Sequence, residues 1–309
     1  GGAGPGGAPS GRLQGVEQEG EKTMGKIVIV GSGPAGCSAA LYAARAGQEV
    51  VVISMGMGAL SKAELIQNYY GFEEGITGAE LYRQGVAGAK AVGAEFITAE
   101  VVGLDYTGSL VVQTTAGDYP ADAVILATGT GRIAPKIAGL AEHEGRGVSY
   151  CATCDAFFYR GKTAAVLGSG EYALHEVQAL LPLAGKVILC TNGEPLTADF
   201  PEGVEICTEK LAAVEGEEKV SALRLENGEL LPVEGLFVAL GVAGSAALAR
   251  KLGAPVENGR IVVDERMQTG IPGLYAAGDC TGGLLQVCKA VYEGALAATE
   301  AIKQIRGKK

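Results

Sequence analysis

The chain has 309 residues, of which 48% are hydrophobic and 19% charged, with 49 glycines; this suits about two α/β domains and excludes a disordered or fibrous protein. The 35 acidic and 25 basic residues give a net charge of −10, which argues against non-specific binding to nucleic acid or to an anionic membrane. The sequence has no apolar run near the ~20 residues of a membrane span and no apolar secretory segment at its start, so we expect a cytoplasmic protein.

Residues 1–23 are rich in Gly, Pro and Glu, lack an apolar period and precede Met24. We interpret them as a disordered extension or a cloning remnant and exclude them from the fold. The fold is therefore expected to begin at Lys26.

The first predicted strand, KIVIV at 26–30, runs directly into GSGPAG and then into an Ala-rich helix. Glycines at this point let the backbone turn tightly and approach a pyrophosphate at the helix N-terminus, so the order predicts a dinucleotide site. The second strand of such a site usually ends in an acidic residue that holds the ribose, but here it ends at Ile53 and Ser54. The ribose must be held in another way.

Several shorter strands are predicted next, and the last of them ends in ATG at 127–129. Residues 162–194 then repeat the order of strand, Gly-rich turn, helix and strand, with Gly168, Gly170 and Ala173 in the turn. The sequence therefore predicts an α/β fold with two Rossmann-like, three-layer dinucleotide-binding domains.

The last part of the chain contains one more strand that runs into a Gly-Asp turn at Gly278 and Asp279, followed by an Ala-rich helix. A carboxylate at this turn could accept a hydrogen bond from a sugar or polyol hydroxyl.

The segment SYCATCDAFF, at 149–158, holds two cysteines at C-x-x-C spacing. A structural zinc site needs four ligands, and no second cysteine pair supplies them. A permanent disulfide across so short a loop would add little stability, whereas a C-x-x-C pair is well suited to redox cycling. Asp155, directly behind the second cysteine, is either an acid/base for a thiol or a helix cap or solvated carboxylate.

The remaining cysteines lie in apolar or Gly-rich contexts, where we expect them to pack as small hydrophobic residues. They are Cys37, Cys190, Cys207, Cys280 and Cys288.

From Lys26 almost to its end, the chain resembles the low-molecular-weight thioredoxin reductases, which are FAD flavoproteins. The motifs that carry the resemblance are GSGPAG at 31–36, NYYGF at 68–72 with the EGITGAEL that follows, ATG at 127–129, GRGVSYCATCDAFFYRGK at 145–162, LFVALG at 236–241 and IPGLYAAGDC at 271–280.

The resemblance implies an FAD domain split in sequence, at 24–131 and 242–309, with a pyridine-nucleotide-type domain inserted at 132–241. It also implies a redox disulfide, with Cys154 beside the flavin, Cys151 exchanging with thioredoxin and Asp155 as the acid/base. A homodimer is implied as well. The residues implied to bind FAD are Gly31, Gly33, Pro34, Ala35, Gly36, Ser54, Asn68, Thr128, Gly129, Gly278, Asp279, Gln286 and Val287.

Three departures from the family pattern argue against NADPH recognition. The His-Arg-Arg stretch of NADPH-dependent members is replaced by Thr-Asn-Gly-Glu at 191–194, which leaves a 2′-phosphate without an arginine partner. The Arg-Gln pair after the Gly-Asp turn becomes Gln286 and Val287, and Gly-Gly-Gln-Leu becomes the segment at 56–62. NADH stays open, because the Gly168 and Gly170 turn could still receive a pyrophosphate.

These departures resemble a subgroup of thioredoxin reductases that take electrons from ferredoxin, in two single-electron steps rather than by hydride transfer. Ferredoxins are acidic, so docking on a chain of net charge −10 would need a local basic surface. The candidates, whose alternative role is ordinary solubility, are Lys136, Arg146, Arg160 and Lys162.

Three further hypotheses stay open at this point. The protein could be a flavoprotein disulfide oxidoreductase with another electron donor. The protein could be an NAD(P)H-dependent reductase of thioredoxin or of a peroxiredoxin-type partner. It could also be a flavoprotein whose disulfide works as a redox sensor without turnover.

Overall fold

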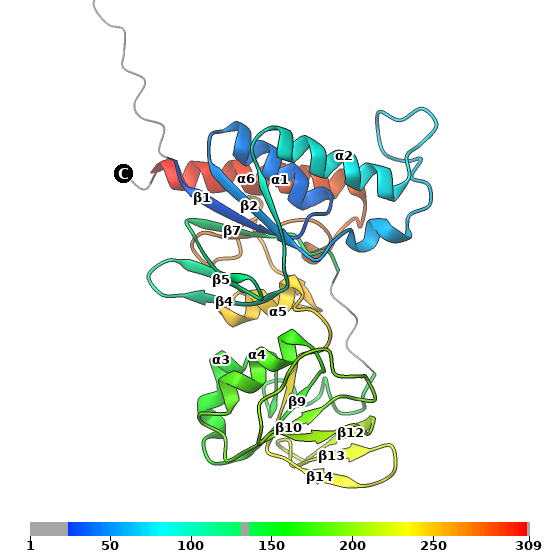
Figure 1. The fold of residues 1–309 in the computed structure, drawn as a ribbon, viewed down its shortest axis with the longest axis vertical. Coiled ribbons are helices and arrows are strands. Elements are labelled where there is room, and N and C mark those ends of the chain that lie inside the picture. The colour runs from blue at the N-terminus through cyan, green and yellow to red at the C-terminus, as the bar shows by residue number, and fades with distance from the viewer. Residues whose placement is uncertain (1–23, 131–135, 308–309) are drawn as a thin grey trace, which may run out of the picture.

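The computed structural model describes residues 24–130 and 136–307, and within them two five-stranded parallel sheets dominate (Figure 1). The first sheet takes strands from both ends of the chain, and we call the part built on it the split unit. The second sheet is built from the middle of the chain, and we call its part the inserted unit. The predicted residues 1–23 extension lies outside the described residues.

The parallel sheet of the split unit has the strand order β18-β7-β1-β2-β3. Its strands are β1 (Lys26–Val30), β2 (Glu49–Ser54), β3 (Glu95–Thr98), β7 (Ala123–Leu126) and β18 (Leu274–Ala276). The central strands are buried on both faces, as their unbroken apolar runs predict.

Helices cover one face of this sheet and a small antiparallel sheet covers the other (Figure 1). The helices are α1 (Pro34–Arg45), α2 (Gly78–Ala91) and α6 (Val287–Gly307). The antiparallel strands are β4 (Val101–Tyr106), β5 (Leu110–Thr114) and β6 (Gly117–Ala121). α6 approaches α1 so closely that a Cβ on Gly294 would lie 2.1 Å from the Ala35 carbonyl oxygen.

The inserted unit has the strand order β11-β10-β9-β15-β8 in its parallel sheet, and a three-stranded antiparallel sheet beside it. The parallel strands are β8 (Val148–Ser149), β9 (Thr163–Leu167), β10 (Lys186–Cys190), β11 (Glu205–Cys207) and β15 (Gly235–Val238). The antiparallel strands are β12 (Leu211–Glu215), β13 (Ala222–Leu225) and β14 (Leu230–Pro232). The helices are α3 (Ala152–Asp155), the 3-10 turn η2 (Ala156–Tyr159) and α4 (Glu171–Leu180).

After β15 the chain returns to the split unit through α5 (Ser245–Lys251) and the short hairpin of β16 (Val256–Glu257) and β17 (Arg260–Ile261). The predicted α/β fold with two Rossmann-like parallel sheets is confirmed. The domain boundaries that the resemblance implies stay a prediction.

The two units meet where α4 and α5 both pack against β4 (Figure 1). Leu104 of β4, Val177 of α4 and Leu248 of α5 are all buried and belong to one hydrophobic cluster. No helix within the described residues is long and apolar enough to cross a membrane.

Candidate functional site

The first Gly-rich turn brings β1 directly onto the N-terminus of α1. Gly31 has a φ of 109°, a left-handed value that favours glycine, and a Cβ there would lie 2.3 Å from the Ala127 carbonyl oxygen. A Cβ on Gly36 would lie 1.9 Å from the carbonyl oxygen of Gly31. Pro34 occupies the first turn of α1, where its missing N–H removes no helical hydrogen bond. The glycines therefore hold the free N–H groups of α1 at the edge of the sheet.

Two other predicted segments converge on this turn. Thr128 follows β7, and its backbone nitrogen lies 3.0 Å from the position of a Cβ on Gly31. Gly278 follows β18, and a Cβ there would lie 3.0 Å from the Ala35 Cβ. The sheet therefore gathers the GSGPAG, ATG and Gly-Asp motifs at one edge, the carboxyl end of its strands, although they are spread over most of the chain.

Four more of the residues implied to bind FAD make contacts around this edge of the sheet. The Ser54 hydroxyl, at the end of β2, lies 2.6 Å from the Ser32 hydroxyl within the Gly-rich turn. The Asn68 side-chain amide donates a 2.9 Å hydrogen bond to the Gln286 side chain, 218 residues further along. Val287, the first residue of α6, packs with the small cluster around Leu60.

The C-x-x-C pair lies at the carboxyl end of the other sheet. Cys151 and Cys154 are joined in a disulfide, and Cys151 is the N-cap of α3. The Cys151 Sγ accepts a 3.1 Å hydrogen bond from the Cys154 backbone N–H. Cys151 is only 4% exposed, whereas Cys154 is exposed. The two sulfurs therefore face different surroundings.

Asp155 lies next to this disulfide and is partly exposed. Its carboxylate accepts a 2.7 Å hydrogen bond from the Ser149 hydroxyl, and the same hydroxyl accepts from the Cys151 backbone N–H at 3.1 Å. Ser149 thus connects Asp155 with the backbone of Cys151.

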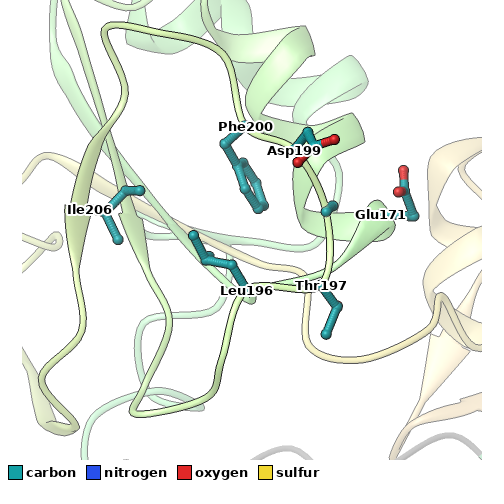
Figure 2. A pocket seen from close by; sticks show the side chains of 7 residues that line it. Glu171, Leu196, Thr197, Asp199, Phe200 and Ile206 are labelled. Atoms are coloured by element: carbon teal, nitrogen blue, oxygen red, sulfur yellow. The ribbon is translucent and has the colours of Figure 1, made fainter.

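The second Gly-rich turn, between β9 and α4, is covered by another part of the inserted unit. The Thr197 backbone N–H donates a 2.8 Å hydrogen bond to the Ser169 carbonyl, and a Cβ on Gly170 would lie 3.0 Å from the Thr197 hydroxyl. A pocket of about 520 Å³ beside this turn carries the carboxylates of Glu171 and Asp199 on its wall (Figure 2). Thr197 therefore covers the turn, and two acidic residues line the pocket beside it.

The profile of the family described as pyridine nucleotide-disulphide oxidoreductase matches residues 25–294. A thioredoxin reductase from Aquifex aeolicus is 35% identical over 307 residues, covering 92% of this chain and 94% of that protein. The chain belongs to the low-molecular-weight thioredoxin reductase family.

Two solved structures are similar to this chain over most of its length. The atypical thioredoxin reductase TRi from Desulfovibrio vulgaris Hildenborough is 41% identical, with a TM-score of 0.86 over 92% of this chain and 98% of that one. A ferredoxin-flavin thioredoxin reductase from Clostridium acetobutylicum is 35% identical, with a TM-score of 0.70 over 92% of this chain and 99% of that one.

Membership of the thioredoxin reductase family implies FAD, and the site in the split unit fits it. A Cβ on Gly33 or on Gly129 would meet no atom within 4 Å, so open space adjoins the N-terminus of α1 and the ATG turn. The Ser54 hydroxyl contacts the Gly-rich turn, and the Thr128 hydroxyl lies 2.7 Å from that of Ser245. Burial raises the pKa of Asp279, and the nearby Glu293 adds to this, while Lys289 and Arg260 act in the opposite direction.

The thioredoxin reductase fold also brings together functional groups that the sequence did not predict. At the Gly-Asp turn, the Glu293 carboxylate accepts from the Gly278 backbone N–H at 2.8 Å and forms an ion pair with Lys289 at 3.0 Å. Lys289 also donates to the Gly278 carbonyl at 2.8 Å. In the sequence, the i, i+4 spacing of Lys289 and Glu293 could have predicted this ion pair.

A second group lies where the two units meet, and the sequence gave no sign of it. Glu176 of α4 and Lys251 of α5 form an ion pair in which both side chains are 1% exposed. Burial alone would raise the pKa of Glu176, but hydrogen bonds from His175, Lys251 and the Ala152 N–H, together with the charge of Lys251, lower it. Glu176 is therefore a buried carboxylate ion in contact with the redox segment.

The structure corrects two expectations drawn from the sequence. Cys37, Cys190 and Cys280 are buried as expected, and the partly buried Cys207 packs against a hydrophobic cluster, but Cys288 is exposed, because its end of α6 is open to solvent. A basic residue also lies near the end of β10: the Lys210 side chain packs over Gly193, with its Cε 3.2 Å from the position of a Cβ there. Lys210 comes from another strand connection, so the linear motif did not reveal it.

Proposed function

We propose that this chain is a thioredoxin reductase that passes electrons through FAD to the Cys151–Cys154 disulfide and then to thioredoxin, with reduced ferredoxin as the donor. The observation that carries the choice of donor is the covered and acidic turn at Ser169 and Gly170. We further propose a cytoplasmic homodimer with the domain boundaries that the resemblance implies.

Negative charge beside the second Gly-rich turn disfavours binding of a pyridine nucleotide. A dinucleotide pyrophosphate carries two negative charges and binds where backbone N–H groups at a helix N-terminus are free and the surroundings are neutral or basic. Here Glu171 is the first residue of α4, and Asp199 lies on the same pocket wall (Figure 2). Two carboxylates at this position would repel the pyrophosphate, which favours a donor that reaches the flavin without using this pocket.

Bound FAD would carry electrons from the donor to the disulfide. Two electrons and two protons convert Cys151 and Cys154 into a dithiol. The Cys151 thiolate then attacks the thioredoxin disulfide, and the Cys154 thiolate attacks Cys151 Sγ, releasing reduced thioredoxin and restoring the disulfide. The Cys151 Sγ accepts a hydrogen bond from the Cys154 backbone N–H, and this hydrogen bond stabilises negative charge on the sulfur.

An exposed aromatic surface beside the disulfide suits a protein partner. Phe157 and Phe158 are 66% and 67% exposed, and the Arg160 guanidinium lies 5.3 Å from the Phe157 ring centre. Exposed apolar groups with a cation beside them are typical of interaction sites. We assign Phe157 and Phe158 to the contact with thioredoxin, whereas Arg160, at their edge, is also a candidate for the donor surface.

The donor is tested by mixing the purified anaerobic protein with NADPH, NADH or reduced ferredoxin and following the loss of the visible flavin band. We expect rapid bleaching with ferredoxin and slow or no bleaching with either nucleotide. Rapid bleaching with a nucleotide would refute the ferredoxin proposal.

NADPH dependence is the second candidate function, and Lys210 is the observation that favours it. Its ammonium group could reach a 2′-phosphate near Gly193, although as a single charge and not as a bidentate partner. If NADPH bleaches the flavin, Lys210→Ala should raise the KM for NADPH at least several-fold, while the KM for NADH stays unchanged. An equal effect on both nucleotides would remove Lys210 from 2′-phosphate recognition.

The role of the disulfide is tested by Cys154→Ser, with Cys207→Ser, which replaces another partly accessible cysteine of the inserted unit, as the control. Cys154→Ser should retain the yellow flavin and lose thioredoxin reduction, and retained turnover would remove the pair from the mechanism. In the native protein, flavin bleaching without thioredoxin reduction would favour the redox sensor.

Asp155→Asn should slow the thiol step without displacing FAD, and an unchanged rate across pH would leave Asp155 a structural residue.

A further inference from the structure

Glu176 joins the redox segment to the other unit. One oxygen of its carboxylate accepts a 2.5 Å hydrogen bond from the backbone N–H of Ala152, the residue that follows Cys151. The other oxygen forms the ion pair with the Lys251 ammonium. Glu176 lies on α4 of the inserted unit and Lys251 ends α5 of the split unit. A single buried carboxylate therefore bridges the disulfide helix and the neighbouring unit.

Lys251 contacts the redox segment a second time through its backbone. The Cys154 Sγ lies 3.4 Å from the Lys251 carbonyl oxygen. In the disulfide this sulfur carries no hydrogen, so the contact is a close packing; in the dithiol an S–H could donate there. The Lys251 ammonium also lies 5.5 Å from the Tyr172 ring centre, and the neighbouring Arg250 guanidinium lies 4.4 Å from that of Tyr150. Both cations of α5 thus hold aromatic residues of the inserted unit.

This arrangement leaves the two cysteines unequally accessible. Cys154 is exposed, but Cys151, the sulfur assigned to thioredoxin exchange, is 4% exposed. A protein partner cannot attack or be attacked by a buried sulfur, so exchange requires α3 to leave its present surroundings. The contacts that must then break include those that α5 makes with α3 and α4.

We propose that Glu176 and Lys251 are positioning residues that hold the Cys151–Cys154 disulfide against the split unit for reduction, and that separation of this ion pair exposes Cys151 to thioredoxin. The proposal rests on the proposed thioredoxin reductase function. An ion pair suits such a role because charges that separate into water regain their hydration, which offsets the lost attraction. The arrangement with the ion pair formed and the arrangement with Cys151 exposed can therefore have similar free energies and alternate.

The test separates the two half-reactions and measures Cys151 directly in the purified holoprotein. Photoreduction of the bound flavin supplies electrons without any natural donor, and the return of the flavin band then reports transfer to the disulfide. Oxidation of the pre-reduced protein by thioredoxin reports exchange. Mass spectrometry after maleimide treatment of the dithiol form reports the accessibility of Cys151.

The variants are Lys251→Met, the charge-conserving Lys251→Arg, and the double variant Glu176→Gln with Lys251→Met. The double variant removes both buried charges, so it leaves no unpaired charge that could unfold the protein. Lys186→Met, which removes an exposed lysine paired with Glu205 in the same unit, is the matched control. In Lys251→Met and in the double variant we expect flavin-to-disulfide transfer to slow by about ten-fold or more, because small misplacements of reacting groups cost up to ~10²-fold. Cys151 labelling should accelerate several-fold and thioredoxin exchange should not slow. Lys251→Arg and Lys186→Met should resemble the native protein.

Two results would overturn the proposal. Unchanged Cys151 labelling in the double variant would show that the pair does not hold α3, and equal slowing of both half-reactions would indicate a general structural role. The labelling and flavin-to-disulfide measurements need no thioredoxin, so they remain decisive even if the protein fails to reduce thioredoxin and the proposed function falls.

Discussion

At the scale of single residues, environment differentiates cysteines that look alike in the sequence. Cys190 and Cys207 occupy paired positions on the parallel strands β10 and β11. Cys190 is fully buried and donates a side-chain hydrogen bond to the partly exposed Cys207. That hydrogen bond, together with one from the Glu209 backbone N–H, lowers the pKa of Cys207 to about 6 although burial opposes the change.

We predict that Cys207 reacts rapidly with iodoacetamide at neutral pH. With a pKa of about 6 it is mostly thiolate at pH 7, whereas an ordinary cysteine of pKa ~8.5 is only about 3% thiolate there. The thiolate is present above pH 6 and is lost as the pH falls through that value, so the labelling rate should be flat above about pH 7 and decline below it. Peptide mass spectrometry across pH measures this profile.

Two substitutions at Cys190 give the control for this prediction. Cys190→Ala removes the hydrogen bond and should shift the labelling profile of Cys207 to higher pH. Cys190→Ser keeps a donor of similar size and should leave the profile near its native position. Identical profiles for both variants would show that the hydrogen bond does not set the reactivity of Cys207.

At the scale of elements, the turn between β1 and α1 depends on close backbone contact. Gly36→Ala would place a methyl group 1.9 Å from the Gly31 carbonyl oxygen, and neither backbone segment can yield easily. We expect it to destabilise the protein by about 1–3 kcal/mol or more and to release FAD. Gly88→Ala, inside α2 with its nearest neighbour at 4.0 Å, should stabilise by ~0.5–1 kcal/mol and retain FAD. Urea unfolding and the flavin-to-protein absorbance ratio measure both effects.

The ion pair between α4 and α5 gives a second prediction at this scale. Lys251→Met leaves the Glu176 carboxylate buried with only His175 and the Ala152 N–H as partners, which should cost about 3–5 kcal/mol in the free energy of unfolding at pH 7. The pKa of Glu176 is lowered in the folded state even though burial opposes this, so in the native protein its stabilising contribution is present above the ordinary value of 4.5 and is lost as the pH falls below it. In Lys251→Met, burial without the lysine raises the pKa of Glu176, so protonation relieves the penalty in the variant as the pH falls, and the native protein loses its gain only below 4.5. Urea unfolding of both proteins from pH 7 to 3 should therefore show the difference in the free energy of unfolding shrinking with acidity. A constant difference would contradict an ionised Glu176.

Local pattern predicted the elements well and the tertiary contacts poorly. KIVIV and GSGPAG predicted β1 and the turn into α1, because each short apolar run and each glycine has its effect within a few residues. Glu176 and Lys251 lie 75 residues apart on helices with no shared motif, so their pairing is decided only by how α4 and α5 pack. The same holds for Thr197, which covers the second Gly-rich turn from 28 residues away, and for the exposure of Cys288.

At the scale of the whole molecule, charge limits how a protein donor can approach. The chain carries a net charge of −10, so an acidic partner such as ferredoxin is repelled on average, over a range of about 10 Å at 0.1 M salt. The basic residues expected to offset this are exposed at Arg146, Arg160 and Lys162, and Lys136 is exposed as well. Their role depends on whether they act as a local surface or only contribute to the total charge.

A pair of charge reversals distinguishes these possibilities. Arg160→Glu with Lys162→Glu changes the net charge by −4, and so does Arg224→Glu with Lys303→Glu, which replaces two exposed cations on other elements, β13 and α6. We expect the first double variant to slow flavin reduction by ferredoxin several-fold at low ionic strength and the second to have a much smaller effect, since attraction between facing charges falls steeply with distance. Stopped-flow bleaching of the flavin at rising salt measures both.

The salt dependence then decides the interpretation. If Arg160 and Lys162 face the donor, their reversal should matter most at low salt and fade toward about 1 M, where the screening length is near 3 Å. Equal slowing by both double variants would mean that only total charge matters, and the donor would then approach through another face. Slowing of thioredoxin exchange with unchanged flavin reduction would assign these two cations to the surface that Phe157 and Phe158 share, because the Arg160 guanidinium already lies against the Phe157 ring.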